Sequence, residues 1–286
     1  MTGWDRGLLA PAQARLVARW LGAPVLVDDL SWGIVDSTVL HVRAGDRAYI
    51  VKAGGERNHH LDREIDAHDG YTAVLVERGL VGALRHADRG ERVLVIDRLP
   101  GDLVSGTAAE IDADLHRQAG RALAVLHAGP GRVDETYEQR VTARTLAWLD
   151  ADHRIAPEVE TRARRILETQ RGGAVRVVPT HGDWQPRNWL DDDGVLRVID
   201  FGRFALRPAS SDLCRLAAQQ WRDRPDLAAA FVEGYGSDPR SDPLWPVEQL
   251  REAVGTAAYA FQIGDPVFEA QGQRMLADAL RAFPDV

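Results

Sequence analysis

The sequence is nearly free of cysteine and lysine and contains no long apolar run. A single cysteine, Cys214, excludes an internal disulfide, and its Asp-Leu-Cys-Arg-Leu helical setting favours packing over a role as nucleophile. No stretch approaches the roughly 18 apolar residues of a membrane-spanning helix. The first 20 residues carry Asp5 and several arginines, and they lack the uninterrupted apolar core of a signal peptide. These absences predict a cytoplasmic protein with no membrane partner.

The sequence also has no excess of basic residues. The 35 basic and 43 acidic residues give a net charge of −8. General nucleic-acid binding relies on a basic surface that displaces counterions, so this charge balance argues against it. With 286 residues, of which 45% are hydrophobic, the chain is long enough to bury one or two cores. We therefore expect a globular protein whose partner is a small molecule, and no oligomeric state is predicted.

The chemistry that is present is concentrated between His181 and Asp200. This segment has the sequence His-Gly-Asp-Trp-Gln-Pro-Arg-Asn, followed by a polar turn and by Val-Ile-Asp-Phe-Gly. Phosphoryl transfer needs a carboxylate that orients the attacking hydroxyl, and oxygen ligands that hold Mg²⁺ on the nucleotide phosphates. Asp183, Asn188 and Asp200 provide this set.

The spacing of these residues has a structural reason. Val175–Val178 and Val195–Ile199 are apolar, β-branched runs typical of strands, and Asp191–Gly194 is a tight turn signal. Two strands joined in this way would return Asp200 to the loop that carries the other two residues, where three oxygen-bearing side chains suit Mg²⁺. The alternative is that both aspartates have structural duties only, in an Asx-turn and at a strand end.

This segment resembles the catalytic loop of the protein-kinase-like small-molecule kinases, the aminoglycoside phosphotransferases and choline kinases. The resemblance lies in His-Gly-Asp at residues 181–183, Asn188 and the following Asp200, although Gly182 stands where protein kinases have arginine. It implies an α+β, bilobal protein-kinase-like fold with a small β-rich N-lobe and a mainly helical C-lobe. The expected lobes are residues 1–97, which bind the nucleotide, and residues 98–286, which carry the catalytic loop and acceptor-binding helices.

The same resemblance implies the cofactors and the roles of the residues. The expected cofactors are ATP, or GTP, and Mg²⁺. Asp183 is the expected catalytic residue, and Asn188 and Asp200 are the expected metal ligands. We expect His181 to organise the loop through hydrogen bonds, while Gln185 and Arg187 either touch the γ-phosphate or stay exposed.

Lys52 is the only lysine of the chain, although arginine is abundant. It ends the strand-like run Ala48–Val51, the context in which the kinase fold places the lysine that pairs with nucleotide phosphates and with a helix glutamate. A point charge and a planar guanidinium are not interchangeable at such a site. Glu64 is the predicted partner, ahead of Asp62 and Asp66.

Glu64 also shares a helical i, i+4, i+8 spacing with His60 and His68. Such a stripe could bind a metal ion. Because no fourth ligand clusters with it, a solvated polar helix face is the favoured interpretation.

Two further segments are expected at the nucleotide. Residues 31–37 occupy the place of the phosphate-covering turn, with Gly33 as their only glycine and the Ser37 hydroxyl as a contact to the β-phosphate. A plain hairpin connection is the alternative. Arg92–Gly101 reads as a buried strand that runs into a Pro-Gly break, a natural lobe boundary. The resemblance implies that the backbone here binds adenine, which makes Ile96 to Arg98 the candidates.

The segment after Asp200 is too short for the activation segment of a protein kinase, since Arg207-Pro208 and a helix follow within a few residues. This favours a small hydroxyl-bearing acceptor. Asp212 matches an acidic residue that the family commonly has here, and it either braces the catalytic loop or stabilises a helix N-terminus.

We therefore predict an ATP-dependent O-phosphotransferase. The acidic charge balance leaves room for a small cationic acceptor. A composition rich in arginine and alanine, together with the resemblance, suggests antibiotic resistance by inactivation of an aminoglycoside or of a cationic peptide such as capreomycin or viomycin. The alternatives are a metabolic kinase for choline, a sugar or an amino alcohol, and a nucleotide-binding pseudokinase regulator. The acidic residues expected to hold a cation are Asp150, Asp152, Asp238, Asp242, Glu248, Glu252, Asp265 and Glu269.

Overall fold

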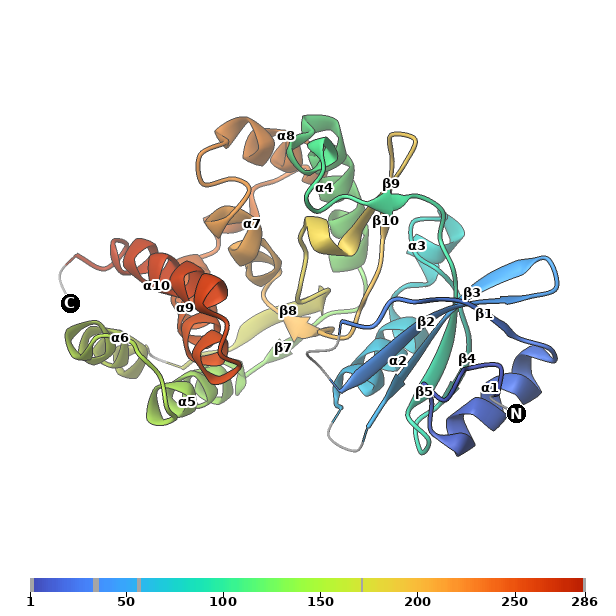
Figure 1. Ribbon diagram of the computed structural model, residues 1–286. Coiled ribbons are helices and arrows are strands. Elements are labelled where there is room, and N and C mark those ends of the chain that lie inside the picture. Colours follow the sequence, from blue (N-terminus) through green and yellow to red (C-terminus); the bar gives the residue numbers. More distant parts are fainter. Residues whose placement is uncertain (1–2, 33–35, 56–57, 171, 285–286) are drawn as a thin grey trace.

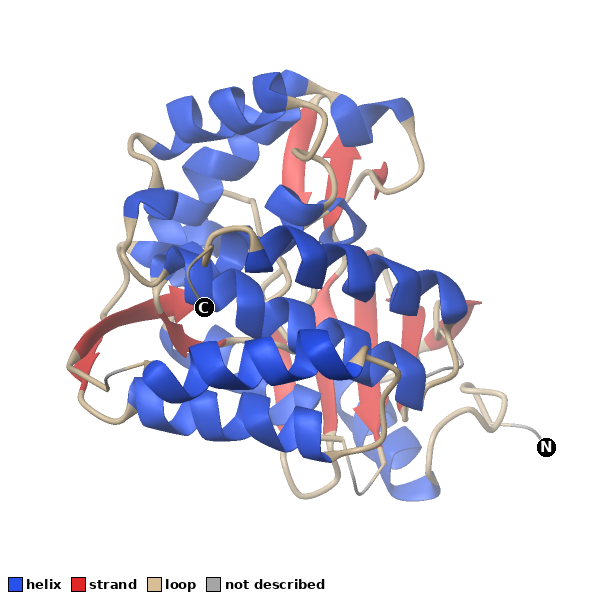
Figure 2. Ribbon diagram, turned by 90° about the vertical axis from the view of Figure 1, so that its left-hand side faces the viewer, coloured by secondary structure: helices blue, strands red, loops and turns tan. Residues whose placement is uncertain are grey.

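The computed structural model describes residues 3–32, 36–55, 58–170 and 172–284 (Figure 1). The N-terminal part is built around one large β-sheet, whereas most of the C-terminal part is helical (Figure 2). This arrangement confirms the α+β fold predicted from the sequence.

The N-terminal sheet has five antiparallel strands in the order β1-β2-β3-β5-β4. Its strands are β1 (Val25–Asp29), β2 (Ser37–Ala44), β3 (Arg47–Gly54), β4 (Leu84–Asp88) and β5 (Val93–Asp97). One face is covered by α1 (Pro11–Leu21), whose Val17 belongs to the same buried cluster as Val51 and Val95. The pleat of β3 directs Tyr49, Val51 and Ala53 to this face.

The opposite face of the sheet is covered by α2 (His60–Gly70), which α3 (Ala73–Glu77) follows. Leu61 and Ile65 of α2 pack against Leu94 and Ile96 of β5. Lys52 is one residue from Val51 along β3, so the alternation of the strand directs it toward α2. The pleat therefore decides that the only lysine meets this helix.

The C-terminal part contains two buried cores. The first lies between α4 and α8 and includes Trp184, Trp189 and Phe201, so the segment of residues 181–201 is anchored by large side chains. The second lies among α6, α9 and α10. The helices of this part are α4 (Ala113–His127), α5 (Tyr137–Asp150), α6 (Pro157–Thr169), α7 (Cys214–Ala218), α8 (Pro225–Tyr235), α9 (Trp245–Gln262) and α10 (Pro266–Leu280).

Two three-stranded sheets complete this part, with the orders β10-β9-β6 and β11-β8-β7. Their strands are β6 (Asp102–Leu103), β7 (Arg132–Asp134), β8 (Val175–Thr180), β9 (Trp189–Asp192), β10 (Val195–Val198) and β11 (Ala205–Arg207). The chain enters this part directly from β5 through residues 98–101. A lobe boundary at residue 97 stays a prediction.

One expectation about the strands was wrong. The run Val195–Ile199 does not form a hairpin with Val175–Val178, because its partner is β9, which starts directly after the catalytic loop. The missed strand, Trp189–Asp192, is only four residues long and overlaps the Asp-rich turn signal, which hid it. The helix expected after Arg207-Pro208 begins as a 3₁₀ turn over Ala209–Leu213, which the five-residue α7 follows.

Within the described ranges, no helix combines the length and the apolar character needed to cross a bilayer.

The close approach of α4 and α8 depends on Gly120. A Cβ added at this residue would lie 2.1 Å from the carbonyl oxygen of Phe231 and 2.9 Å from the amide nitrogen of Tyr235. Gly120→Ala should therefore lower the free energy of unfolding by about 1–3 kcal/mol through overpacking, although alanine favours helices. Urea unfolding measures the difference.

Gly255→Ala in α9 is the matched control, because the nearest atom to its added Cβ is Trp148 Nε1, at 4.0 Å. This variant should be unchanged or up to about 1 kcal/mol more stable. Equal stability of the two variants would show that backbone contact at Gly120 does not limit the packing of α4 and α8.

Candidate active site

The short hairpin β9–β10 brings the predicted site residues together. The loop of residues 181–188 runs from β8 into β9, and Val198 of β10 lies opposite Trp189 of β9. Beyond the hairpin, the N–H of Ile199 donates to the carbonyl of Asn188 at 3.0 Å. Asp200 is therefore held beside the loop, with a φ of 67° that few residues other than glycine adopt.

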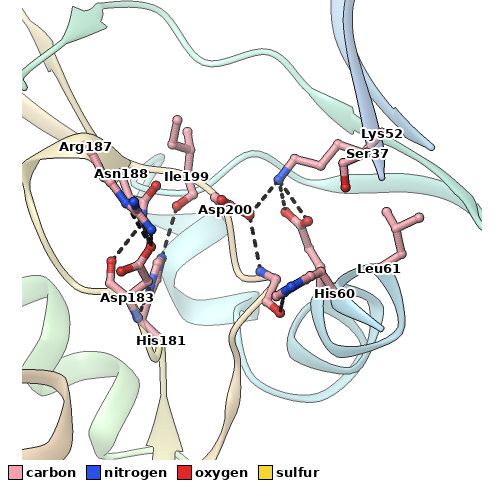
Figure 3. A network of polar contacts seen from close by, with 12 residues as sticks. Ser37, Lys52, His60, Leu61, His181, Asp183, Arg187, Asn188, Ile199 and Asp200 are labelled. Atoms are coloured by element: carbon pink, nitrogen blue, oxygen red, sulfur yellow. Dashed lines mark hydrogen bonds and ion pairs between the residues drawn. The ribbon is translucent and has the colours of Figure 1, made fainter. Parts of the chain in front are cut away.

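Lys52 connects the N-terminal sheet to this hairpin (Figure 3). Its Nζ lies 2.8 and 2.9 Å from the two carboxylate oxygens of Glu64 and 3.0 Å from Oδ1 of Asp200. The predicted pairing with Glu64 is thus present, whereas Asp62 and Asp66 contact Arg89 instead. Burial alone would lower the pKa of Lys52, but the charges of Asp200 and Glu64 outweigh it and raise this pKa. Lys52 is therefore fully charged at neutral pH.

Asp183 is buried and surrounded by donors. Arg187 Nε donates to its Oδ2 at 3.1 Å, Asn188 Nδ2 to the same oxygen at 2.9 Å, and Gln185 Nε2 to its Oδ1. Arg215 Nη1 lies 2.9 Å from Oδ1. Gln185 and Arg187 therefore bind this carboxylate in the structure, with Gln185 buried and the Arg187 side chain 39% exposed.

These arginines set the charge state of the Asp183 carboxyl group. Burial alone would raise its pKa, but the charges of Arg215 and Arg187 outweigh burial and hold the pKa well below its usual range. Arg203 adds to this field, and the neighbouring charge of Arg215, together with burial, lowers the pKa of Arg203 to about 10. A carboxylate held so firmly in its ionised form is a weak base that can still orient a hydroxyl group.

His181 and Asp212 hold the loop in place. The carbonyl of Ile199 only accepts, so His181 Nε2, 3.0 Å away, carries the proton, and Nδ1 accepts from the N–H of Asp183. Asp212 is fully enclosed and accepts from the N–H groups of His181 (2.9 Å) and Gly182 (2.6 Å) and from His127 Nε2 (3.1 Å). The expected organising role of His181 and the bracing role of Asp212 agree with these bonds.

Two oxygen atoms near Lys52 fit a hard cation. The Nδ2 of Asn188 is occupied by the carbonyl and carboxylate of Asp183, which leaves its Oδ1 without a partner among the described residues. Asp200 Oδ2 is likewise unbonded within the described chain, and this side chain is 50% exposed. No group of three His, Cys, Asp or Glu side chains that could hold a metal occurs in the part of the chain that the structure describes. The set therefore suits a cation such as Mg²⁺ that takes its remaining ligands from phosphates and water.

The histidines considered as a metal stripe have separate contacts. His60 Nδ1 bonds the carbonyl of Gly202 at 2.9 Å, and His68 Nδ1 lies 3.1 Å from the hydroxyl of Thr72. Glu64 between them binds Lys52. Each residue of the stripe thus has a different partner.

The other predicted nucleotide contacts have protein partners in this structure. Ser37 begins β2, and its hydroxyl accepts from Asn58 Nδ2 at 2.6 Å, while Gly33 lies outside the described residues. Ile96 pairs with Ile50 in the sheet, and the N–H of Arg98 donates to the carbonyl of Ala48 at 3.0 Å. Adenine binding by Ile96 and Arg98 and phosphate binding by Ser37 stay predictions, and adenine binding through the Arg98 N–H would require that bond to open.

Arg215 is the site residue that sequence reasoning missed. It joins Asp183 to Glu252, whose carboxylate lies 2.7 Å from its Nη2. The sequence around Arg215 and its neighbour Cys214 predicted only a helix that packs against the core. The one available signal was its i, i+3 spacing from Asp212, which places both on the side of the helix facing the loop.

Comparisons with known proteins agree with this geometry. The sequence model of the phosphotransferase enzyme family matches residues 30–247. No curated protein matches the sequence. Among solved structures, a thermostable mutant of the aminoglycoside phosphotransferase APH(4)-Ia, in complex with ADP and hygromycin B, is similar with a TM-score of 0.69 and 15% identity, over 95% of this chain and 99% of that chain.

Two other solved structures are also similar. The choline kinase LicA from Streptococcus pneumoniae has a TM-score of 0.64 and 13% identity, over 94% of this chain and 99% of that chain. The macrolide 2'-phosphotransferase MphH from Brachybacterium faecium has a TM-score of 0.62 and 21% identity, over 93% and 98%. At these identities the similarity establishes the fold.

The brace at Asp212 can be tested with Asp212→Asn. An amide oxygen replaces only one of the two acceptors, and its NH₂ group faces N–H donors, so the free energy of unfolding should fall by about 2–4 kcal/mol. Hydrogen exchange should show lost protection at the amides of His181 and Gly182. Asp46→Asn, in the exposed β2–β3 turn, is the control and should change neither quantity.

The difference in unfolding free energy between the wild type and Asp212→Asn should also depend on pH. Burial alone would raise the pKa of Asp212, but its hydrogen bonds, first the one from His127, hold this pKa below its ordinary value. The stabilisation is therefore complete above the unfolded-state pKa of about 4 and is lost as the pH falls below it. A stability difference that grew on acidification would contradict the ionised brace.

Proposed function

The chain belongs to the phosphotransferase enzyme family, and we propose that it transfers the γ-phosphoryl group of ATP to a hydroxyl group of a small molecule. The enzyme class, an ATP-dependent phosphotransferase of small molecules, is the one predicted from the sequence. The observation that carries the residue assignment is the position of Lys52, which contacts Glu64 and Asp200 at once. One cation thereby joins the nucleotide-binding sheet to the hairpin that carries the reactive loop.

The nucleotide role of Lys52 rests on its charge and its surroundings. It is fully charged, held by two carboxylates, and it leaves β3 on the face that α2 covers. ATP binding is further supported by the ADP and AMP-PNP named with the similar APH(4)-Ia structures. GTP is the alternative nucleotide.

Asn188 and Asp200 would hold Mg²⁺ through Oδ1 and Oδ2, which have no partner in the described chain. When bound, this ion neutralises charge that develops on the transferring phosphoryl group. Asn188 is fixed for this task because its amide nitrogen is bound to Asp183.

Asp183 is the proposed catalytic residue. Its carboxylate must turn from Gln185 and Arg187 toward the acceptor hydroxyl, which it orients for in-line attack. A low pKa suits this role, since in a loose transition state the hydroxyl gives up its proton late. Release from Asp183 would free Arg187 to contact the γ-phosphate.

The short connection after Asp200 supports a small acceptor. Only residues 201–204 separate it from β11, and the 3₁₀ turn over Ala209–Leu213 follows directly. No segment of the described chain between these elements is long enough to dock a peptide in the way that protein kinases do. The aminoglycoside, cationic-peptide and metabolic acceptors named above therefore remain the hypotheses to compare.

The acidic residues expected to hold a cationic acceptor are largely engaged within the fold. Asp242 and Asp265 accept N–H groups at the starts of helical turns. Each of the following forms an ion pair with an arginine: Asp150, Asp238, Glu248, Glu252 and Glu269. Because these charges are compensated, they provide less support for a cationic acceptor. The metabolic acceptors remain an alternative.

The test is ADP release from Mg·ATP with aminoglycosides, capreomycin, viomycin, choline and small sugars. Asp183→Asn should reduce turnover by roughly 10²–10⁴ with the responsive acceptor, because the hydroxyl loses its orienting carboxylate. ATP binding, followed by thermal shift, should persist. Asp193→Asn in the exposed turn of the same hairpin is the control and should leave turnover unchanged. Near-normal turnover in Asp183→Asn would remove Asp183 from this role, and ATP binding without turnover by the wild type would favour a pseudokinase.

Lys52→Arg tests the nucleotide contact. A guanidinium is longer and planar, so it cannot reproduce three contacts of about 3 Å from one nitrogen. We expect at least a roughly tenfold loss of kcat/KM for ATP with the fold retained, while Arg43→Lys on the neighbouring strand should leave it unchanged. Wild-type kinetics in Lys52→Arg would show that this lysine does not contact the phosphates.

A further inference from the structure

One short segment of the chain binds the loop that carries Asp183 through three side chains. Asp212, Arg215 and Gln219 have helical i, i+3 and i+7 spacing over the 3₁₀ turn and α7, so they lie on one face. Asp212 accepts from two backbone amides of the loop, as described above. Arg215 contacts the side chain of Asp183, and Gln219 Nε2 donates to Oε1 of Gln185 at 3.3 Å. The segment thus holds side chains of the loop as well as its backbone.

Arg215 is held from two sides. Its Nη1 lies 2.9 Å from Oδ1 of Asp183, and its Nη2 lies 2.7 Å from Oε1 of Glu252 in α9. The side chain of Arg215 is only 11% exposed and that of Asp183 only 4%. Because different nitrogens of one planar group bind the two carboxylates, the guanidinium cannot turn without losing one of them. The position of Arg215 therefore depends on α9 as well as on α7.

The two oxygens of the Asp183 carboxylate have different surroundings. Oδ1 is bound by Arg215 and by Gln185. Oδ2 is bound by Arg187 and Asn188 (Figure 3). The Arg187 side chain is 39% exposed, and Asp183 is its only carboxylate partner in the described chain, whereas Arg215 is enclosed and has a second one. Arg187 is therefore the arginine that can leave when substrates bind, and Arg215 is the one that stays.

We propose that Arg215 is a positioning residue, which keeps Oδ1 of Asp183 bound while Oδ2 accepts the hydrogen bond of the acceptor hydroxyl. The proposal rests on the proposed function and adds the residue that fixes its carboxylate. Without this contact the carboxylate could rotate about its Cβ–Cγ bond, and the hydroxyl would be aligned for attack in fewer molecules. Glu252 in turn holds Arg215 in place.

The first experiment replaces Arg215 and measures ADP release with the responsive acceptor. Arg215→Gln should lower kcat roughly 10- to 100-fold and leave the KM for ATP near the wild type, because a misplaced carboxylate weakens the chemical step. Arg215→Lys retains the charge, but its single nitrogen cannot occupy the positions of both Nη1 and Nη2, so kcat should stay at least roughly tenfold below the wild type. Wild-type kcat in either variant would overturn the proposal.

A double variant separates positioning from a general loss of structure. In Asp183→Asn the carboxylate that Arg215 positions is already gone, so adding Arg215→Gln should lower the residual kcat by no more than about twofold. A further fall as large as in the wild-type background would overturn the proposal, because Arg215 would then act without Asp183. Arg164→Gln is the matched control and should leave kcat unchanged, since Arg164 also binds two carboxylates, those of Asp150 and Glu160.

Glu252→Gln is a milder variant that stays informative if Arg215→Gln does not fold. The Glu252 side chain is 29% exposed, and the amide oxygen of glutamine can still accept from Arg215. We expect kcat to fall about threefold to tenfold while the KM for the acceptor is unchanged. A higher KM for the acceptor at wild-type kcat would overturn the proposed hold on Arg215, because Glu252 would then bind the acceptor.

A thermodynamic cycle tests the contact without turnover. Urea unfolding is measured for the wild type, Arg215→Gln, Asp183→Asn and the double variant. The effects of the two substitutions on the unfolding equilibrium constant should depart from additivity by at least about threefold, and additive effects would overturn the proposal. Absence of turnover in the wild type would count against the proposed function, while the cycle still decides whether Arg215 holds Asp183.

Discussion

The contact of Lys52 with Glu64 and Asp200 is the interaction on which the rest of the site depends. Three elements meet at this nitrogen: the central strand β3, the helix α2 and the end of the β9–β10 hairpin. Removing either partner of a buried ion pair leaves an uncompensated charge, so such a contact fixes geometry more than it adds stability. The contact therefore fixes the sheet relative to the helical part, with Lys52 directed toward the loop that carries Asp183 and Asn188.

Local charge in this protein differs from its average charge. A chain with a net charge of −8 surrounds the carboxylate of Asp183 with Arg187, Arg203 and Arg215. Their field keeps Asp183 ionised and limits its strength as a base, which fits a reaction that needs orientation more than proton abstraction. The acidic residues that produce the negative average are engaged largely in ion pairs and at helix ends elsewhere, so the net charge does not describe the surroundings of Asp183.

Much of the fold could be predicted because its elements follow local rules. Apolar, β-branched runs predicted β3, β5, β8 and β10. The same rules missed β9, because four residues that end in Asp-Asp resemble a turn more than a strand. They also missed Arg215. A helical Asp-Leu-Cys-Arg-Leu run does not indicate that the arginine contacts the carboxylate of Asp183, which is 32 residues earlier in the chain.

The sequence by itself determined the family and the α+β class and selected the residues proposed for phosphoryl transfer, because residue type and spacing within the loop are local properties of the chain. It also determined that Lys52 is the only side chain with a compact ammonium. Only the tertiary structure decided which groups surround Asp183 and Lys52. Those facts depend on distances between segments far apart in sequence, and Coulomb energies at a site are set by such distances and by burial, which composition does not contain.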